Sequence, residues 1–321
     1  MDAAIIKNTV NHTKRQKRPS LLRSISEHKF LYLLILPGLI YYIIYRYIPM
    51  FGLLIAFKDY SPAMGISGFF TAEWIGLRNL KLLFDSIYFV DILKNTLIIS
   101  FLKLAASFPV AILLAIMINE VRNKYLKKFI QTVTYYPHFL SWVVIGAVMF
   151  EMFSTTTGAV NNMLQQLIGH KVDILANPEN FRALLVMSHL WQSAGWSAII
   201  YLAAITGIDE SIYESAMIDG ATRIQRILFI TIPSIIPTIV VVLTLSLGHV
   251  LDAGFEQVFV LYSPKVYEVG DIIDTYVYRE GLVNARYGFA TAIGFFKSLI
   301  GFVLVFSTDR LAKKLGNSGI F

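Results

Sequence analysis

Long apolar runs with almost no charge constrain the fold of this chain more than any other feature of its sequence. The first run, at about residues 30–54, is longer than the roughly 20 residues that a helix needs to cross a bilayer. Only 15% of the 321 residues are charged, whereas soluble domains average about 25%, so the chain has too few charges to cover a water-facing surface. We therefore predict an all-α integral membrane protein.

Six apolar segments predict a bundle of about six transmembrane helices, at about 30–54, 95–118, 132–153, 183–206, 233–251 and 287–308. Pro49 and Gly52 are expected to break the first span near its outer end. This run is too long for the apolar core of a signal peptide and has no small-residue cleavage site, so we expect it to be retained. The chain then divides into a basic N-terminal segment, residues 1–29, and a membrane domain, residues 30–321.

The distribution of lysine and arginine around the spans predicts the orientation of the chain. With the N-terminus inside, the inner segments hold 16 lysines and arginines and the outer connections hold 8. Because basic residues concentrate on the cytoplasmic side of membrane proteins, we expect both termini to be cytoplasmic. The two longest outer connections, 55–94 and 252–286, are long enough to form short interfacial helices.

The motifs that the sequence lacks exclude several classes of function. It has no cysteine, which rules out disulfides, thiolate metal sites and cysteine nucleophiles. It has no G-x-x-x-x-G-K-[ST] phosphate loop, no H-E-x-x-H or G-x-S-x-G motif and no cluster of metal ligands. The net charge of +7 comes from basic residues beside apolar segments, which indicates membrane orientation rather than nucleic-acid binding. We expect no catalytic residues, no metal and no cofactor on this chain.

The most informative segment is the inner connection between the fourth and fifth spans, at about 207–232. Good helix formers predict a short helix at about 210–217, and Gly220 then supplies a turn, since glycine adopts the left-handed conformation that ends helices. A second helical piece at about 221–230 is expected to stop before Pro233. A short rigid element tied at both ends to membrane helices can carry motion between a soluble motor and a pore.

Within this segment the chain resembles the "EAA" loop of binding-protein-dependent ABC importer permeases. The resemblance lies in Glu214-Ser215-Ala216, in Asp219-Gly220-Ala221 and in Pro233, thirteen residues past Gly220. Ser215 and Ile232 stand where the family usually has alanine and leucine. Further similarity, at 137–143, 191–196, 201–204, 255–257 and 271–278, is to the carbohydrate permeases of that family.

The resemblance implies that this loop is a coupling helix docked in a cleft of an ATPase subunit. The positions that it marks for coupling are Tyr213, Glu214, Ser215, Ala216, Asp219, Gly220, Ala221 and Pro233. The alternative for the segment is an ordinary amphipathic connector that ends at a glycine. The small side chains of Ser215 and Ala216 would let the helix sit deep in a partner's groove.

The resemblance also implies the partners and the substrate. ATP and magnesium are expected on two separate ATPase subunits, beside a second permease, expected to be a different chain, and an extracytoplasmic solute-binding protein. The whole would lie in the bilayer of a bacterial cytoplasmic membrane and import a sugar, expected to be an oligosaccharide. An ABC permease for amino acids or peptides and an ion-coupled secondary transporter remain as alternatives.

Polar residues inside the spans are candidates for the substrate path, because a charge at a helix centre costs roughly 2.5–3.5 kcal/mol on insertion and therefore needs a role. Lys297 in the sixth span could line the path or pair internally. His189, Trp191 and Gln192 in the fourth span could receive a sugar, although packing and interfacial anchoring are common roles for such residues. Lys103 is more easily explained by snorkelling or internal pairing.

Overall fold

The computed structural model describes residues 28–248 and 250–314. Within these ranges the chain is helical, with one isolated antiparallel bridge between Lys58 and Trp74 and no strands. The chain divides into two compact units, Met1–Leu53 and Leu54–Phe321. The basic segment predicted at residues 1–29 lies almost entirely outside the described residues. The prediction of an all-α protein is confirmed for the part that the structure describes.

Nearly all of the described residues of the first unit, 28–53, belong to the first predicted span. α2 (Lys29–Tyr42) passes through a π-helical turn at Ile43–Tyr47 into α3 (Ile48–Met50), and the backbone then tightens to a 3₁₀-helix at Phe51–Phe57. The regular α-helix therefore ends just after Pro49, where the sequence predicts a break. Its apolar side chains are exposed, as expected of a helix that faces lipid.

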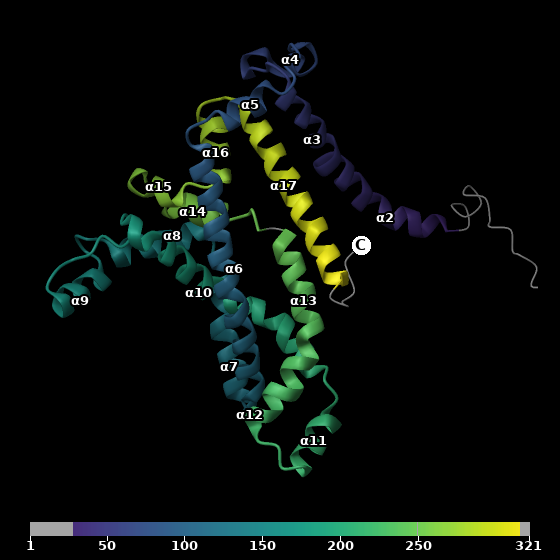
Figure 1. Cartoon of the computed structure of the whole chain (residues 1–321), viewed down its shortest axis with the longest axis vertical. Coiled ribbons are helices and arrows are strands. Elements are labelled where there is room, and N and C mark those ends of the chain that lie inside the picture. The colour runs from purple at the N-terminus through teal and green to yellow at the C-terminus, as the bar shows by residue number, and fades with distance from the viewer. Residues whose placement is uncertain (1–27, 249, 315–321) are drawn as a thin grey trace, which may run out of the picture. The chain divides into compact units, whose positions relative to one another are not determined.

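Four long helices form the body of the second unit (Figure 1), namely α6 (Phe89–Glu120), α10 (Pro178–Thr206), α13 (Ile232–Gly248) and α17 (Tyr287–Lys314). At 1.5 Å per residue, the 32 residues of α6 span about 48 Å. α6 packs along α10, and α13 packs against both α10 and α17. These helices contain the second, fourth and sixth predicted spans, and α13 covers residues 233–248 of the fifth, which was predicted at about 233–251.

By length and composition, four described helices can cross a membrane, at Lys29–Phe57, Phe89–Glu120, Arg223–Gly248 and Tyr287–Ser307. The count rises to five if two helices joined at a sharp bend, Lys124–Phe139 and Trp142–Phe153, are counted as one span. α10 is long enough, with 29 residues, but it carries several polar side chains and is not among these helices. The predicted count of six depends on α10 and stays a prediction.

The third predicted span, 132–153, is broken in two, and the expectation of one helix there is wrong. α7 (Lys124–Tyr135) continues into a 3₁₀ turn at Tyr136–Phe139, and α8 (Trp142–Phe153) leaves at 98° to it. The break has local causes. Pro137 has no amide hydrogen, and Ser141 caps α8 by accepting a hydrogen bond from the Val144 N–H at 3.4 Å.

Both long outer connections fold into short helices, as predicted. Residues 55–94 contain α4 (Gly65–Thr71) and α5 (Arg78–Phe84), and residues 252–286 contain α14 (Phe255–Leu261), α15 (Tyr267–Gly270) and α16 (Ile273–Tyr278). The second group is not a surface layer, because Val258, Val266 and Ile272 are buried in one core with Phe181 and Leu185 of α10. The connection between α13 and α17 is therefore part of the core.

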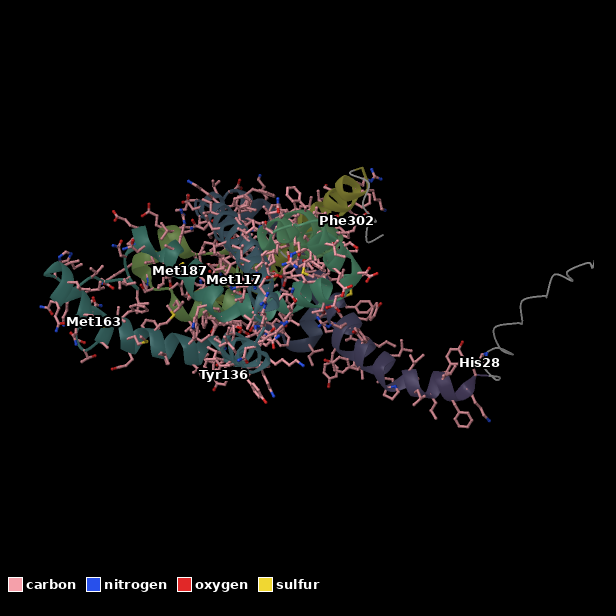
Figure 2. All side chains as sticks on the ribbon, turned by 90° about the horizontal axis from the view of Figure 1, so that it is seen from below. His28, Met117, Tyr136, Met163, Met187 and Phe302 are labelled. Atoms are coloured by element: carbon pink, nitrogen blue, oxygen red, sulfur yellow. The ribbon has the colours of Figure 1, made fainter. Side chains whose placement is uncertain are left out.

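Large apolar side chains cover much of the outside of the second unit. Met117, Met187 and Phe302 are each about two thirds exposed, and Figure 2 labels them among the side chains that surround the helices. Soluble monomers rarely expose contiguous apolar surface on this scale. The surface is that of a protein whose helices face lipid or other membrane helices.

α7 and α10 approach each other closely at Gly195. A Cβ atom at this position would lie 2.0 Å from the backbone oxygen of Thr134. Backbone cannot move aside as the tip of a side chain can, so only glycine permits this approach. The contact fixes α7 against the body of the unit.

Candidate functional site

Between α10 and α13 the chain forms α11 (Glu210–Ile218), which lies at the end of the second unit opposite α5 and α16 (Figure 1). Its N-cap is Asp209, whose carboxylate accepts a hydrogen bond from the Ser211 N–H at 3.0 Å. This backbone hydrogen bond lowers the pKa of Asp209, so the cap is charged at neutral pH. A negative charge there complements the positive end of the helix dipole.

α11 ends in the turn predicted at Asp219 and Gly220. Gly220 has a φ of +78°, in the left-handed region. Its N–H donates to the Met217 carbonyl at 3.1 Å, and the Ala221 N–H donates to the Ala216 carbonyl at 2.9 Å. The two hydrogen bonds form a Schellman motif, which supplies donors to carbonyl groups that would otherwise have no hydrogen-bond partner at the end of the helix. A residue with a Cβ would cost roughly 1–2 kcal/mol in this conformation, so Gly220 defines the turn.

We expected the helical piece after the turn to stop before Pro233. This expectation is wrong, because the helix continues past Pro233. Thr222 and Gln225 form a capping box that begins α12 (Arg223–Arg226), and the helix then runs through a π-helical turn at Ile227–Thr231 into α13. A proline removes one helical N–H and crowds the turn before it. The wider π turn directly before Pro233 relieves this crowding, so the helix continues.

Two side-chain contacts tie this segment to the rest of the unit. The hydroxyls of Tyr213 and Thr231 lie 2.9 Å apart, which joins α11 to the π turn. The Arg223 guanidinium pairs with the carboxylate of Glu120, the last residue of α6, and donates to its backbone oxygen at 2.5 Å. The segment is therefore attached to both α13 and α6.

The outward surface of α11 is open. Glu214 and Ser215 are exposed, and the apolar side chain of Ile218 is 86% exposed. A hollow of about 370 Å³ beside the turn is lined by Ala216, Asp219, Gly220, Ala221, Gln225, Arg226, Phe229 and Ile230. Seven of the eight positions predicted for coupling lie on α11 or its turn, and the eighth, Pro233, lies in α13. The exposed face of α11, the hollow beside it and the exposed side chain of Ile218 together form a surface that a partner could cover.

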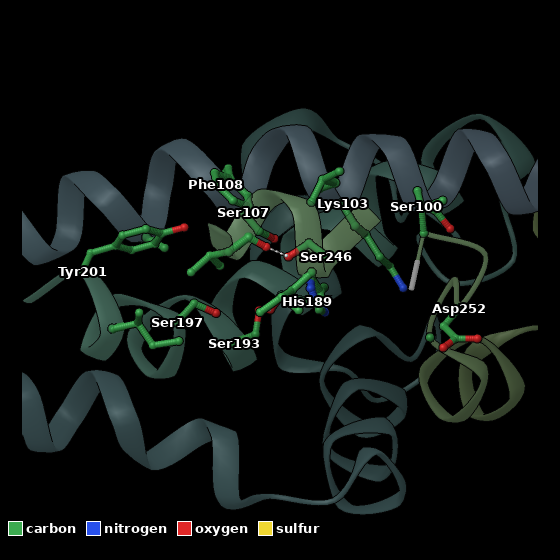
Figure 3. Close-up of a pocket in the computed structure, with 17 residues that line it drawn as sticks. Ser100, Lys103, Ser107, Phe108, His189, Ser193, Ser197, Tyr201, Ser246 and Asp252 are labelled. Atoms are coloured by element: carbon green, nitrogen blue, oxygen red, sulfur yellow. Dashed lines mark hydrogen bonds between the residues drawn. The ribbon is translucent and has the colours of Figure 1, made fainter. Parts of the chain in front are cut away.

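A cavity of about 540 Å³ lies between α6, α10 and α13 (Figure 3). Six hydroxyl groups line it, those of Ser100, Ser107, Ser193, Ser197, Tyr201 and Ser246. His189, Lys103 and Asp252 also line it. Lys103 is buried and donates to the backbone oxygen of Ala253 at 2.6 Å. The lining is rich in groups that both donate and accept hydrogen bonds.

Lys297 lines a second cavity, of about 490 Å³, together with residues of α13 and α17. Its ammonium group contacts both carboxylate oxygens of Asp274, at 2.8 and 2.9 Å, and one oxygen of Asp252. Asp252 lines both cavities. The internal pairing considered for Lys297 is therefore present, and its place in a substrate path stays a prediction.

The three residues predicted as a cluster on α10 do not share one surface. His189 lines the first cavity. Trp191 is 56% exposed and lies outside that lining, while Gln192 donates to the Leu140 carbonyl at 3.5 Å, at the break before α8. Residues two apart in a helix point to nearly opposite sides, which separates Trp191 from His189.

Sequence reasoning did not connect Lys103 and the serines to a site, although a signal was present. Polar residues recur every three or four positions within two apolar spans, as Ser100, Lys103 and Ser107 on α6 and as His189, Ser193 and Ser197 on α10. This spacing places each set on one helix face. A search for polar stripes in apolar helices finds both walls of the first cavity.

Comparison with known proteins finds relatives that match nearly the whole chain. The polygalacturonan/rhamnogalacturonan transport system permease protein YteP of Bacillus subtilis (strain 168) is 46% identical over 308 residues, which cover 96% of this chain and 95% of that protein. Protein LplB of the same organism is 41% identical over 302 residues, which cover 94% of each.

Two solved structures share the fold at high sequence identity. One is a crystal structure of a bacterial ABC transporter involved in the import of the acidic polysaccharide alginate, in which the matching chain has a TM-score of 0.85 and 42% identity, covering 92% of this chain and 99% of that one. The other is the bacterial alginate ABC transporter in complex with an alginate pentasaccharide-bound periplasmic protein, with the same TM-score and identity.

A family model described as the inner membrane component of binding-protein-dependent transport systems matches residues 107–317. The matched range includes α11, its turn and the helices on either side of them. The family predicted from the loop is therefore confirmed, and the chain belongs to the inner membrane components of binding-protein-dependent transport systems.

Proposed function

We propose that this chain is the membrane-spanning permease subunit of an ATP-driven importer, and that its substrate is a sugar, in particular an oligosaccharide delivered by a solute-binding protein. The observation that carries the proposal is α11, a short helix with an exposed outer surface that is joined by a glycine turn to one continuous helix, Arg223–Gly248. The relatives named as polygalacturonan/rhamnogalacturonan and alginate transporters support the sugar.

The chain itself would hydrolyse no ATP. Because its sequence has no phosphate loop, ATP and magnesium would be bound by separate ATPase subunits, which would dock on α11 from the cytoplasm. The excess of lysine and arginine on the inner segments supports this orientation and cytoplasmic termini. A solute-binding protein would dock at the opposite end, where α5 and α16 lie (Figure 1).

The mechanism follows from how α11 is attached. Closure of the ATPase pair on ATP would move the cleft that holds α11. α11 leads through its turn into one continuous helix, Arg223–Gly248, and the first residue of that helix, Arg223, pairs with Glu120 of α6. The displacement would therefore reach two walls of the first cavity. Access to that cavity would then alternate between the two sides of the membrane as ATP is bound and hydrolysed.

A second permease subunit would complete the path. The apolar outer surface and the open second cavity between α13 and α17 are consistent with such a neighbour in the membrane. The six hydroxyl groups of the first cavity favour a polyhydroxylated substrate over the amino acids and peptides considered as alternatives, which carry charges at both ends.

The proposal is tested on the intact complex, purified with its neighbouring permease and ATPase subunits and reconstituted in lipid nanodiscs with its binding protein. We expect oligosaccharides to stimulate ATP hydrolysis, and amino acids and peptides to have no effect. Stimulation by amino acids or peptides alone would contradict the sugar assignment. Failure of any ATPase subunit to copurify would contradict the assignment as an ABC permease.

A further inference from the structure

A buried cation lines the first cavity without an anionic partner. Lys103 lies near the middle of α6 and is only 6% exposed. Its ammonium group donates to the Ala253 carbonyl at 2.6 Å, and among the described residues it forms no ion pair. Two of its three N–H donors therefore remain uncommitted. A charge in the membrane interior is costly without a counter-ion, so this site favours the entry of an anion.

The carboxylate that lines the same cavity is committed to another cation. Asp252 pairs with Lys297, whose ammonium group also contacts both oxygens of Asp274. The negative charge of Asp252 is therefore partly compensated by Lys297, whereas no described side chain compensates Lys103.

The loop beside Lys103 leaves the ammonium group uncovered by any side chain from its own direction. Gly254 lines the cavity and has a φ of +85°, and a Cβ atom there would lie 2.8 Å from Nζ of Lys103. Only glycine therefore permits the loop to approach the ammonium group this closely. The carbonyl before it, that of Ala253, holds one N–H of the ammonium group and so fixes the position of the charge.

Two further donors without partners flank Lys103 on the same face of α6. Ser100 precedes it by three positions and Ser107 follows it by four, a spacing that places all three on one side of the helix, and Figure 3 shows them along the cavity. Neither hydroxyl has a hydrogen-bond partner in the part of the chain that the structure describes, and Ser100 is only 6% exposed. A carboxylate suits this set of donors, because it only accepts hydrogen bonds and is an anion.

The walls formed by α10 and α13 offer acceptors instead. The Ser193 hydroxyl donates to the His189 carbonyl at 2.7 Å, and the Ser246 hydroxyl donates to the Val242 carbonyl at 2.8 Å. Because a hydroxyl has one hydrogen, both oxygens are left to accept from a ligand. Sugar hydroxyl groups can donate to them. The cavity as a whole therefore matches a molecule that carries both carboxylate and hydroxyl groups.

We propose that Lys103 binds the carboxylate of an acidic oligosaccharide, one that contains uronic acid residues, and that this contact makes the permease prefer acidic over neutral sugars. Ser100 and Ser107 donate to the same part of the ligand. The inference rests on the proposed function and narrows its substrate class.

Two matched pairs of probes test this inference. Tetramers of galacturonate and of alginate are each compared with their carboxyl-reduced forms, which keep linkage and length but replace the carboxylate with a hydroxymethyl group. Binding to the purified complex, without the binding protein, is measured by calorimetry. In at least one pair we expect the acidic tetramer to bind at least about tenfold more tightly than its reduced form, which corresponds to about 1.4 kcal/mol.

The Lys103→Gln variant removes the charge but keeps a donor for the Ala253 carbonyl. We expect it to narrow the preference for the acidic tetramer about tenfold and to change binding of the reduced form by less than about twofold. A purely structural role of Lys103 would weaken both forms alike. Lys103→Met is the second variant if the first assembles poorly.

Lys94→Gln is the matched control. Lys94 lies on the same helix, is exposed and is not part of the lining of the first cavity. It precedes Lys103 by nine residues, or two and a half helical turns, and so lies on the opposite side of α6. It should leave the preference unchanged.

Equal or tighter binding of the reduced tetramer in both pairs, no binding of any tetramer, or an unchanged preference in both Lys103 variants overturns this inference. The proposed function stands in each case if an oligosaccharide still stimulates ATP hydrolysis in the presence of the binding protein. Absence of that stimulation for every sugar counts against the proposed function as well.

Discussion

Substitution of Gly220 by valine isolates the contribution of one turn to the coupling of this permease to its ATPase. Gly220 has a φ of +78°, and a Cβ atom there would meet nothing within 4 Å. The effect of Gly220→Val therefore comes from backbone conformation and not from a clash. A residue with a Cβ costs roughly 1–2 kcal/mol in the left-handed region, and a β-branched residue lies at the upper end.

That cost sets the expected loss of coupling. One to two kcal/mol lowers the population of a formed state by roughly 5–30-fold. If the turn must form before the ATPase can bind α11, the affinity of the ATPase for the permease falls by the same factor. We would measure this affinity by interferometry on nanodisc-embedded permease, together with sugar-stimulated ATP hydrolysis at a fixed ATPase concentration.

The chain supplies a matched control for this experiment. Gly169 follows α9 (Ala159–Ile168) and has a φ of +81°, and a Cβ atom there would likewise meet nothing within 4 Å. Gly169→Val therefore carries the same backbone cost on an outer connection. We expect it to change ATPase affinity by less than about twofold. Equal losses in the two variants would refute the argument that the Gly220 turn is the coupling element.

Three further substitutions have defined outcomes. Tyr213→Phe removes the hydroxyl contact with Thr231 and should weaken the attachment of α11 by about 0.5–1.5 kcal/mol, seen as reduced ATP hydrolysis at unchanged permease stability; a hydrolysis rate equal to the native one would contradict this. Gly195→Ala should destabilise the unit by about 1–3 kcal/mol in a thermal assay of the solubilised complex, because its methyl group meets backbone, whereas Gly294→Ala, in open space, should not. Lys297→Met leaves two carboxylates without their cation and should reduce sugar-stimulated hydrolysis more than Lys297→Arg, with equal effects speaking against an ionic role.

Local patterns in the sequence predicted much of the fold and of the coupling segment. Apolar length located α6, α13 and α17, because a helix in lipid must be long and apolar whatever it packs against. The turn at Gly220 was predictable for a similar reason, since the left-handed conformation favours glycine on steric grounds alone. The position of α11 was predictable because it lies between the fourth predicted span and the turn at Gly220.

Features that depend on contacts between residues far apart in the sequence could not be predicted from local patterns. Lys297 pairs with residues 45 and 23 positions earlier in the chain, and no local pattern encodes such a pairing. The continuation of the helix through Pro233 depends on a π turn that has no simple sequence signature. The burial of Val258 and Ile272, in a connection expected at the interface, likewise depends on how α10 and α6 lie beneath it.

The most direct test of the central claim is the sidedness and protection of α11. The chain has no cysteine, so Ser215→Cys introduces a single thiol on the exposed surface of the helix. A membrane-impermeant maleimide should leave this thiol unlabelled in intact cells, label it in inside-out vesicles stripped of the ATPase, and lose access when the ATPase is added back. Labelling from outside the cell, or labelling that the ATPase does not reduce, would contradict the account.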